Sequence, residues 1–251
     1  PLPDDPPSRR TPGDLGAMAD LSGVVPLATA VLGPSAGHGA LAAPLANFTV
    51  MTPDASIFAA GPPLVKASIG EDVTKEELGG PAVALASGLI HNLASDDRDA
   101  LGQIRQWLSY LPSSFREPPP VVDPVDGLRP VPELLDLVPR NARQAYDMAA
   151  VIDVVVDEGS FFAIGERFGP SMLCGWARLG GATVAVLANQ PQHLAGAIDA
   201  DAADKATAFL GVADAFGVPL VLLTDNPGVL AGTAAERSGI LNWLIDGLID
   251  F

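Results

Sequence analysis

Apolar residues recur at helical spacing in two stretches of the chain. One set, three or four positions apart, consists of Leu101, Ile104, Leu108 and Leu111. This spacing places the four side chains on one face of a helix that ends at Pro112. The other set, which follows the acidic residues Asp199, Asp201 and Asp204, consists of Ala206, Phe209, Leu210, Ala213 and Phe216. Acidic residues are common where a helix begins, so the pattern predicts a second amphipathic helix there.

Strand-like runs lie between and beyond these helices. The run CGWARLGG turns at Gly180-Gly181 into ATVAVLA (182–188), which predicts two strands joined by a turn. The run VPLVLLT (218–224) is apolar throughout, as in a strand that is buried on both faces and paired in parallel. Another strand is predicted after Gly23, and another helix from 141 to 152. Strands that alternate with helices predict an α/β fold.

The composition of the segments predicts the domain organisation. Residues 1–20 are rich in proline and charge and are expected to be disordered. The segment from 116 to 140 is also rich in proline, which favours neither a helix nor a central strand, so it is interpreted as a linker. It separates an N-terminal domain over 21–115 from a C-terminal domain over 141–251.

Charge and cysteine content narrow the possible partners. The 251 residues include 14 basic and 30 acidic ones, a net charge of −16 that would repel nucleic acid or an anionic membrane surface. A coenzyme with a few phosphates stays compatible, because it needs only a local basic patch. Cys174 is the only cysteine, so no internal disulfide can form, and its apolar neighbours indicate a buried thiol. No apolar run is long enough to span a membrane, and the polar start is unlike a signal peptide, so a cytoplasmic protein is expected.

Common catalytic and metal-binding motifs are missing from the sequence. His38, His91 and His193 lack the spacing of metal ligands, and no metal site is predicted. Glycine-rich and turn-forming stretches instead follow the apolar runs: Gly37-His38-Gly39, Asn189-Gln190-Pro191 and Asp225-Asn226-Pro227-Gly228. A glycine turn that enters a helix can direct two peptide N–H groups at a developing oxyanion. The alternative is that all three stretches are ordinary tight turns.

Many longer motifs resemble the β subunits of biotin-dependent acyl-CoA carboxylases, which are carboxyltransferases. In the first half these are LGPSAGHGA, NFTVM, VKASIGEDVTKEELGG, SGLIHN and WLSYLPSSFREPPP. In the second half they include VVVDEGSFFAIGERFGPSMLCGWARLGGATVAVLANQP, AGAIDADAADKATAFLGVADAFGVPLVLLTDNPGVLAGT and Glu236. The resemblance covers residues 22 to about 240, with the motifs in the order of the family.

The resemblance implies a fold, a reaction and partners. The fold would be two crotonase-like domains of the ClpP/crotonase superfamily, built of ββα repeats, in a homo- or hetero-hexamer of β subunits. Each active site would lie between the N domain of one subunit and the C domain of its partner. Carboxybiotin, delivered by a biotin carboxylase and biotin carboxyl carrier α subunit, would give its carboxyl group to the α-carbon of an acyl-CoA. Because biotin itself takes the α-proton in this family, the protein would supply oxyanion donors and positioning rather than a base.

The resemblance also implies roles for particular residues. Gly37, His38 and Gly39 fall where the family places the peptide donors for the thioester enolate. The stretches Asn189-Gln190-Pro191 and Asp225-Asn226-Pro227-Gly228 fall in loops that would shape the substrate and biotin pocket.

The chain departs from the family pattern in three places. The first part of the N domain, which would help to hold CoA, is expected to be missing before about Leu21, and residues 1–20 do not match it well. The chain has Gly-His-Gly where the family commonly has Gly-Gly. The second glycine turn of the family, which would bind the biotin carbonyl, is not found after Ile240, so the chain is expected to be incomplete or gapped. Two alternatives therefore stay open: a non-catalytic structural β subunit of a mixed hexamer, and a biotin-dependent acyl-CoA decarboxylase. Acyl-chain length is not predicted.

Overall fold

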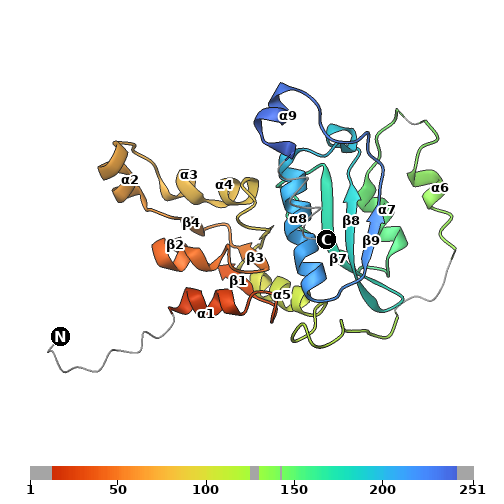
Figure 1. Cartoon of the computed structure of the whole chain (residues 1–251), viewed down its shortest axis with the longest axis horizontal. Helices are drawn as coiled ribbons and strands as arrows, with labels where there is room; N and C mark the ends of the chain where they lie inside the picture. Colours follow the sequence, from red (N-terminus) through yellow and green to blue (C-terminus); the bar gives the residue numbers. More distant parts are fainter. Residues whose placement is uncertain (1–12, 125–129, 142, 242–251) are drawn as a thin grey trace.

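The computed structural model describes residues 13–124, 130–141 and 143–241, and its two halves lie side by side (Figure 1). The elements of the first half are α1 (Asp14–Asp20), β1 (Ala28–Val31), β2 (Pro34–Ala36), the 3₁₀ helix η1 (Gly37–Ala42), β3 (Phe48–Met51), β4 (Ser56–Phe58), α2 (Pro62–Ile69), α3 (Lys75–Gly79), α4 (Pro81–Ala86), β5 (Asn92–Leu93) and α5 (Asp97–Leu108). The strands form two parallel groups, β1-β3-β5 and β2-β4. Parallel pairing with helical crossovers is typical of an α/β layer.

The second half contains one larger sheet between helices. Its elements are α6 (Leu134–Leu137), α7 (Met148–Val155), β6 (Phe162–Ile164), β7 (Met172–Leu179), β8 (Ala182–Asn189), the 3₁₀ helix η2 (Leu194–Gly196), α8 (Ala200–Ala215), β9 (Leu220–Leu223) and α9 (Thr233–Arg237). The strand order is β6-β7-β8-β9, in which the first three strands are antiparallel and β9 is parallel to β8. Side chains alternate between the two faces: Trp176 and Leu187 pack with Phe209 of α8, whereas Ala177 and Val186 pack with α7.

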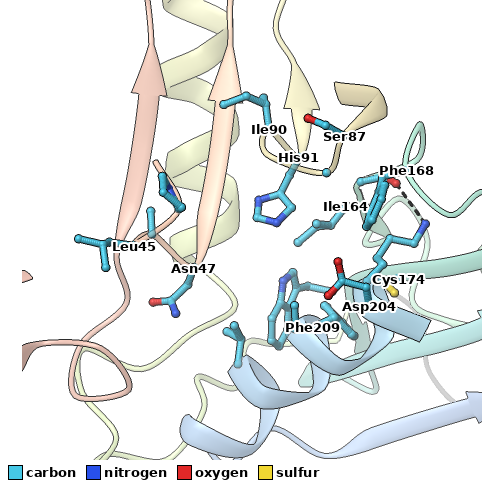
Figure 2. A pocket seen from close by; sticks show the side chains of 18 of the residues that line it. Leu45, Asn47, Ser87, Ile90, His91, Ile164, Phe168, Cys174, Asp204 and Phe209 are labelled. Atoms are coloured by element: carbon cyan, nitrogen blue, oxygen red, sulfur yellow. Dashed lines mark hydrogen bonds between the residues drawn. The ribbon is translucent and has the colours of Figure 1, made fainter. Parts of the chain in front are cut away.

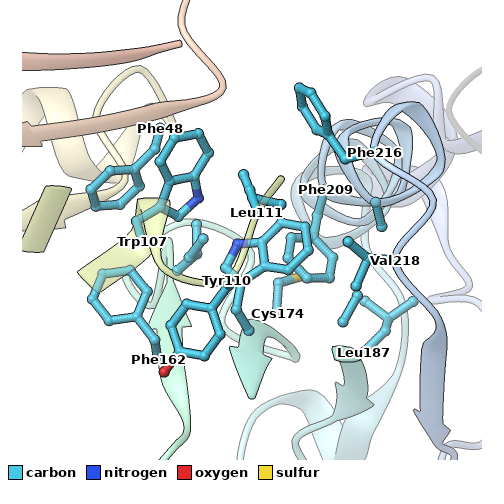
Figure 3. Close-up of a cluster of buried hydrophobic side chains, with 14 of the residues drawn as sticks. Phe48, Trp107, Tyr110, Leu111, Phe162, Cys174, Leu187, Phe209, Phe216 and Val218 are labelled. Carbon is cyan, nitrogen blue, oxygen red and sulfur yellow. The ribbon is translucent and has the colours of Figure 1, made fainter. Parts of the chain in front are cut away.

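One hydrophobic core joins the two halves (Figure 3). Phe48 of β3 stacks on Trp107 of α5, with ring centroids 5.5 Å apart, and meets Phe162 of β6 edge-on at 5.6 Å. On the other side of the cluster, Trp176 of β7 contacts Phe209 of α8 at 5.0 Å. These large side chains exclude water between the halves and therefore fix their relative position.

Arg178, near the end of β7, fastens the segment between the halves. Its guanidinium donates to the carbonyl of Ser109 at 2.8 Å and to that of Pro120 at 3.3 Å, and it lies 5.1 Å from the ring centroid of Tyr110. The predicted turn at Gly180-Gly181 is confirmed. Both of its amides donate to the buried carboxylate of Asp157, each at 2.7 Å.

The predicted helices and strands are present, with four local corrections. Helix α5 ends at Leu108 rather than at Pro112, and it buries Ala100 and Trp107 whereas Leu101 and Leu108 are exposed. The predicted apolar face of α5 was therefore partly wrong. The face that packs against the rest of the protein carries Trp107, which stacks on Phe48 of β3. The helix that was predicted from 141 begins only at Met148, where Asp147 caps it.

The other two corrections concern a segment that was expected to be disordered and the burial of a strand. Residues 14–20 were expected to be disordered, but they form α1. The run in β9 was expected to be buried on both faces. Among the described residues, β9 is the last strand of its sheet, and Leu222 is 58% exposed. Its parallel pairing with β8 is confirmed.

Candidate functional site

The Gly37-His38-Gly39 bend forms the start of η1, directly after β2, and all three residues are exposed. Gly37 has φ +59°, a backbone conformation that favours glycine. A Cβ atom on Gly39 would come no closer than 3.7 Å to any atom outside the bend, and one on Gly37 would meet nothing within 4 Å. The first amides of a helix have no acceptor within it. The bend lies at the surface of its half, with open space beside both glycines.

A cavity of about 290 Å³ adjoins this bend. Gly39 lines it together with β1 and its following turn, and with Ala43 and Ile57. The surface of its walls is about equally polar and apolar, and the side-chain hydroxyl of Thr29 already donates to the carbonyl of Ala42 at 3.4 Å. Among the described residues, no charged side chain lines the cavity, so the space beside the bend suits an uncharged group better than a charged one.

The two loops of the second half come together in the structure, and their role as a wall of the substrate and biotin pocket stays a prediction. Asn226 donates through Nδ2 to Oδ1 of Asn189 at 2.8 Å, and Asn189 donates to the carbonyl of Gly196 at 3.1 Å. The amide of Gly228 donates to Oδ1 of Asn226 at 2.8 Å. Asn189 is buried at the end of β8, so this network fixes both loops against the sheet.

Gln190 and Asp225 attach the same loops to the start of α7. Gln190 donates to Asp147 at 2.7 Å and accepts from the amide of Met148 at 3.2 Å. Tyr146 donates its hydroxyl to Asp225 at 2.8 Å. Burial, and then the Asp225 carboxylate, raise the pKa of Tyr146 to about 12, so the phenol keeps its proton at neutral pH. The loop side chains thus hold the loops in place, whereas Pro191 and Pro227 add no side-chain donor.

A strained turn lies within this group of loops. Leu194 and Ala195 have φ values of +50° and +52°, which non-glycine residues rarely adopt, and Gly196 follows at +79°. A Cβ atom on Gly196 would lie 2.6 Å from the carbonyl oxygen of Asp225, so this glycine allows the two loops to approach. Strain of this kind persists only where surrounding contacts impose it.

The bend and the loops are separate groups within one chain. The cavity at Gly39 is lined by residues 29–57 alone, whereas the loops are bonded to one another and to residues 146–148. An active site formed by the bend of one subunit and the loops of its partner stays a prediction.

Sequence reasoning missed a cluster of ionisable residues between the halves. His91 and His193 were considered as possible metal ligands. His193 is exposed, but His91 lines a cavity together with Lys205, Asp204 and Cys174. The predicted buried thiol is confirmed: Cys174 is 1% exposed, and burial raises its pKa to about 12. The sequence contained one indication of this cluster. Lys205 is a charged residue directly beside the apolar positions that form the buried face of α8.

Two further observations concern metals and membranes. Across residues 13–124, 130–141 and 143–241, no three His, Cys, Asp or Glu side chains come together as metal ligands would. Among the helices in that same part of the chain, none combines the length and the apolar character needed to cross a bilayer.

The fold and the exposed glycine bend define a crotonase-like carboxyltransferase architecture. The family described as "Carboxyl transferase domain" matches residues 13–244, and the chain belongs to this family. The match includes α1, which lies in the segment 1–20 that was expected to be disordered.

Similar proteins include β subunits with different substrates in their names. The chain is 42% identical over 231 residues to the propionyl-CoA carboxylase beta chain of Saccharopolyspora erythraea, covering 88% of this chain and 42% of that one. It is 40% identical over 228 residues to the biotin-dependent long chain acyl-coenzyme A carboxylase beta4 subunit of Mycobacterium tuberculosis, covering 88% and 43%. The chain therefore spans less than half the length of these curated relatives.

The fold is also that of a solved structure. The transcarboxylase 12S hexamer, with methylmalonyl-coenzyme A and methylmalonic acid bound, is 37% identical and superposes with a TM-score of 0.89. The match covers 93% of this chain and 46% of that one.

Proposed function

We propose that the chain is part of the carboxyltransferase subunit of a biotin-dependent acyl-CoA carboxylase. Such a subunit moves a carboxyl group from carboxybiotin on a carrier subunit to the α-carbon of an acyl-CoA. Membership of the carboxyl transferase family supports this, and so does the naming of its relatives as carboxylase β chains. The structural observation that carries the proposal is the exposed bend at Gly37-His38-Gly39 beside a cavity whose described lining residues are all uncharged.

The bend would act on the thioester oxygen of the acyl-CoA. When the α-proton leaves, negative charge develops on that oxygen, and peptide N–H groups fixed in advance stabilise it without reorganisation. Removing one such donor typically costs about 2.7 to 4 kcal/mol in the transition state. The cavity at Gly39, which none of the charged side chains in the described part of the chain lines, would hold the acyl carbons next to the reacting carbon.

The loops of the second half would form the wall on the biotin side. Biotin bound there would supply the carboxyl group, and its ureido group would take the α-proton. The uncharged ring system needs hydrogen-bonding and apolar walls rather than a counter-charge. The one charged side chain in residues 189–191 and 225–228, Asp225, is bonded to the hydroxyl of Tyr146. Asn189 and Asn226 are already bonded to each other and would orient the loop backbone. The site would form between one chain and a partner copy, as in a hexamer of β subunits served by a biotin-carrying α subunit.

Substitution of Gly39 by aspartate tests this function. A side chain at Gly39 fits without close contact, so Gly39→Asp should fold and place a carboxylate where the thioester oxygen would lie. The measurement is bicarbonate- and ATP-dependent carboxylation of acyl-CoA substrates from short to long chain by the full-length assembled complex. We expect kcat to fall about 100-fold or more, as for the loss of an oxyanion donor.

Gly102→Asp is the matched control, because Gly102 is exposed on α5 and a Cβ atom there also meets nothing within 4 Å. This variant should keep normal activity. Normal carboxylation by Gly39→Asp would favour the structural, non-catalytic alternative. Absence of carboxylation of every acyl-CoA by the unaltered complex would exclude the proposed reaction.

A further inference from the structure

A cavity of about 310 Å³ lies between the two halves and contains none of the candidate site residues (Figure 2). Much of its wall is apolar and is contributed by Leu45, Ile90, Ile164, Phe168 and Phe209. At about 30 Å³ for each water-sized group, it has room for roughly ten non-hydrogen atoms. A mostly apolar cavity of this size with a few converging polar groups is typical of a small-molecule site.

His91 presents a hydrogen-bond donor to this cavity. The amide of Thr49 donates to Nδ1 of His91 at 2.9 Å, so in the neutral ring the proton is assigned to Nε2, on the other side of the imidazole. Figure 2 shows the ring directed into the cavity, towards the carboxylate of Asp204 on the opposite wall. Burial, and then the nearby charge of Lys205, lower the pKa of His91 to about 4, so the ring stays neutral at physiological pH.

Lys205 provides further N–H groups. Trp176 also lines the cavity, but its indole nitrogen is fully covered, so the ring contributes apolar surface rather than a donor. Lys205 is 7% exposed and donates one hydrogen bond, at 3.1 Å, to the carbonyl of Gly165. An ammonium group has three N–H donors, and a buried one is costly unless acceptors surround it. The wall is thus rich in donors.

We propose that this cavity binds a small amphipathic monocarboxylate. The carboxylate head accepts hydrogen bonds from Lys205 and Nε2 of His91, and the hydrocarbon tail packs against the apolar wall formed by Ile164, Phe168 and neighbouring residues. Two donors, one of them cationic, favour an anion over an amine. The half-buried carboxylate of Asp204 opposes the anion, which predicts a definite sign for its removal.

The ligand would contact both halves of the chain. Leu45 and His91 belong to the first half, and Phe168 and Lys205 to the second. A ligand that binds only the folded, docked halves stabilises them by mass action. The proposal concerns binding alone, so it does not depend on the carboxyltransferase reaction.

Calorimetric titration of the full-length protein tests the proposal. The probes are hexanoate, hexylamine and hexanamide, which share one tail and differ in the charge of the head. Hexanoate should bind most tightly. Lys205→Met keeps the apolar stem and should weaken hexanoate about tenfold or more, as expected for loss of a charge-assisted hydrogen bond. Asp204→Asn should strengthen it several-fold. Lys66→Met removes an exposed lysine paired with Asp72 and should change nothing.

Several results would overturn the proposal. These are hexylamine or hexanamide binding as tightly as hexanoate, unchanged affinity in Lys205→Met, or weaker binding in Asp204→Asn. An absence of both binding heat and thermal stabilisation at millimolar hexanoate would do so as well. Asp204→Asn alters a half-buried position, so it keeps the test decisive even if Lys205→Met does not fold.

Discussion

Acidification should destabilise the protein through His91, and the structure gives the size of the effect. The ring accepts a hydrogen bond at Nδ1 from the amide of Thr49, and the plane of Phe48 stacks on it with a centroid distance of 5.9 Å. Protonation of the ring at Nδ1 would break that bond and place a cation close to Lys205. The pKa of His91 in the folded protein is therefore lowered from 6.5 to about 4.

The sign follows from which state holds the proton. Above pH 6.5 the ring is neutral in both the folded and the unfolded protein, so it does not change the free energy of unfolding with pH. Between pH 6.5 and about 4 the unfolded chain binds a proton that the folded protein does not, so stability is lost as the pH falls through this window. At about 1.4 kcal/mol for each pH unit, the loss amounts to roughly 3 kcal/mol. That is a large share of the roughly 5 to 15 kcal/mol by which domains are usually stable.

Urea unfolding at pH values from 4 to 8 measures this effect. His91→Asn retains an acceptor for the Thr49 amide but cannot be protonated, so its stability should fall by about 3 kcal/mol less than that of the unaltered protein between pH 7 and pH 4. Carboxylates titrate in both proteins, and their contribution cancels in the difference. The exposed His193 provides the control, because His193→Asn should follow the unaltered protein. Parallel pH curves for His91→Asn and the unaltered protein would refute the reasoning.

Three further outcomes are expected. Arg178→Lys should lower the free energy of unfolding by about 1 to 3 kcal/mol, because an ammonium cannot replace the guanidinium that donates to Ser109 at 2.8 Å; an unchanged urea midpoint would contradict this. Gly196→Ala should lower the melting temperature and the kcat of the assembled enzyme, because its Cβ atom would press on the Asp225 carbonyl 2.6 Å away. Unaltered values in both assays would show that the two loops can move apart without loss. Cys174 should resist iodoacetamide at pH 8 in the folded protein and react in urea, since burial raises its pKa to about 12, and equal rates would disprove its burial.

Much of the local structure could be predicted from residues close together in the sequence. The Asp199 cap of α8 depends on a hydrogen bond to the amide of Ala202, three positions away, which the sequence displays directly. The two glycines likewise predicted the turn at 180–181, although its amides are bonded to the distant Asp157. The face of α5 could not be predicted in the same way. Leucines and Trp107 compete for burial on that helix, and the choice depends on Phe48, which is far away in the sequence.

The candidate site, too, could be predicted from the sequence only in part. The sequence alone identified the glycine bend and the two loops, because glycine, asparagine and proline after apolar runs report on backbone shape. Only the tertiary structure decided that Asn226 bonds Asn189, and that His91 and Lys205 meet at a cavity between the halves. Such contacts form when distant segments fold against each other, and their strength depends on burial, which no short stretch of sequence specifies.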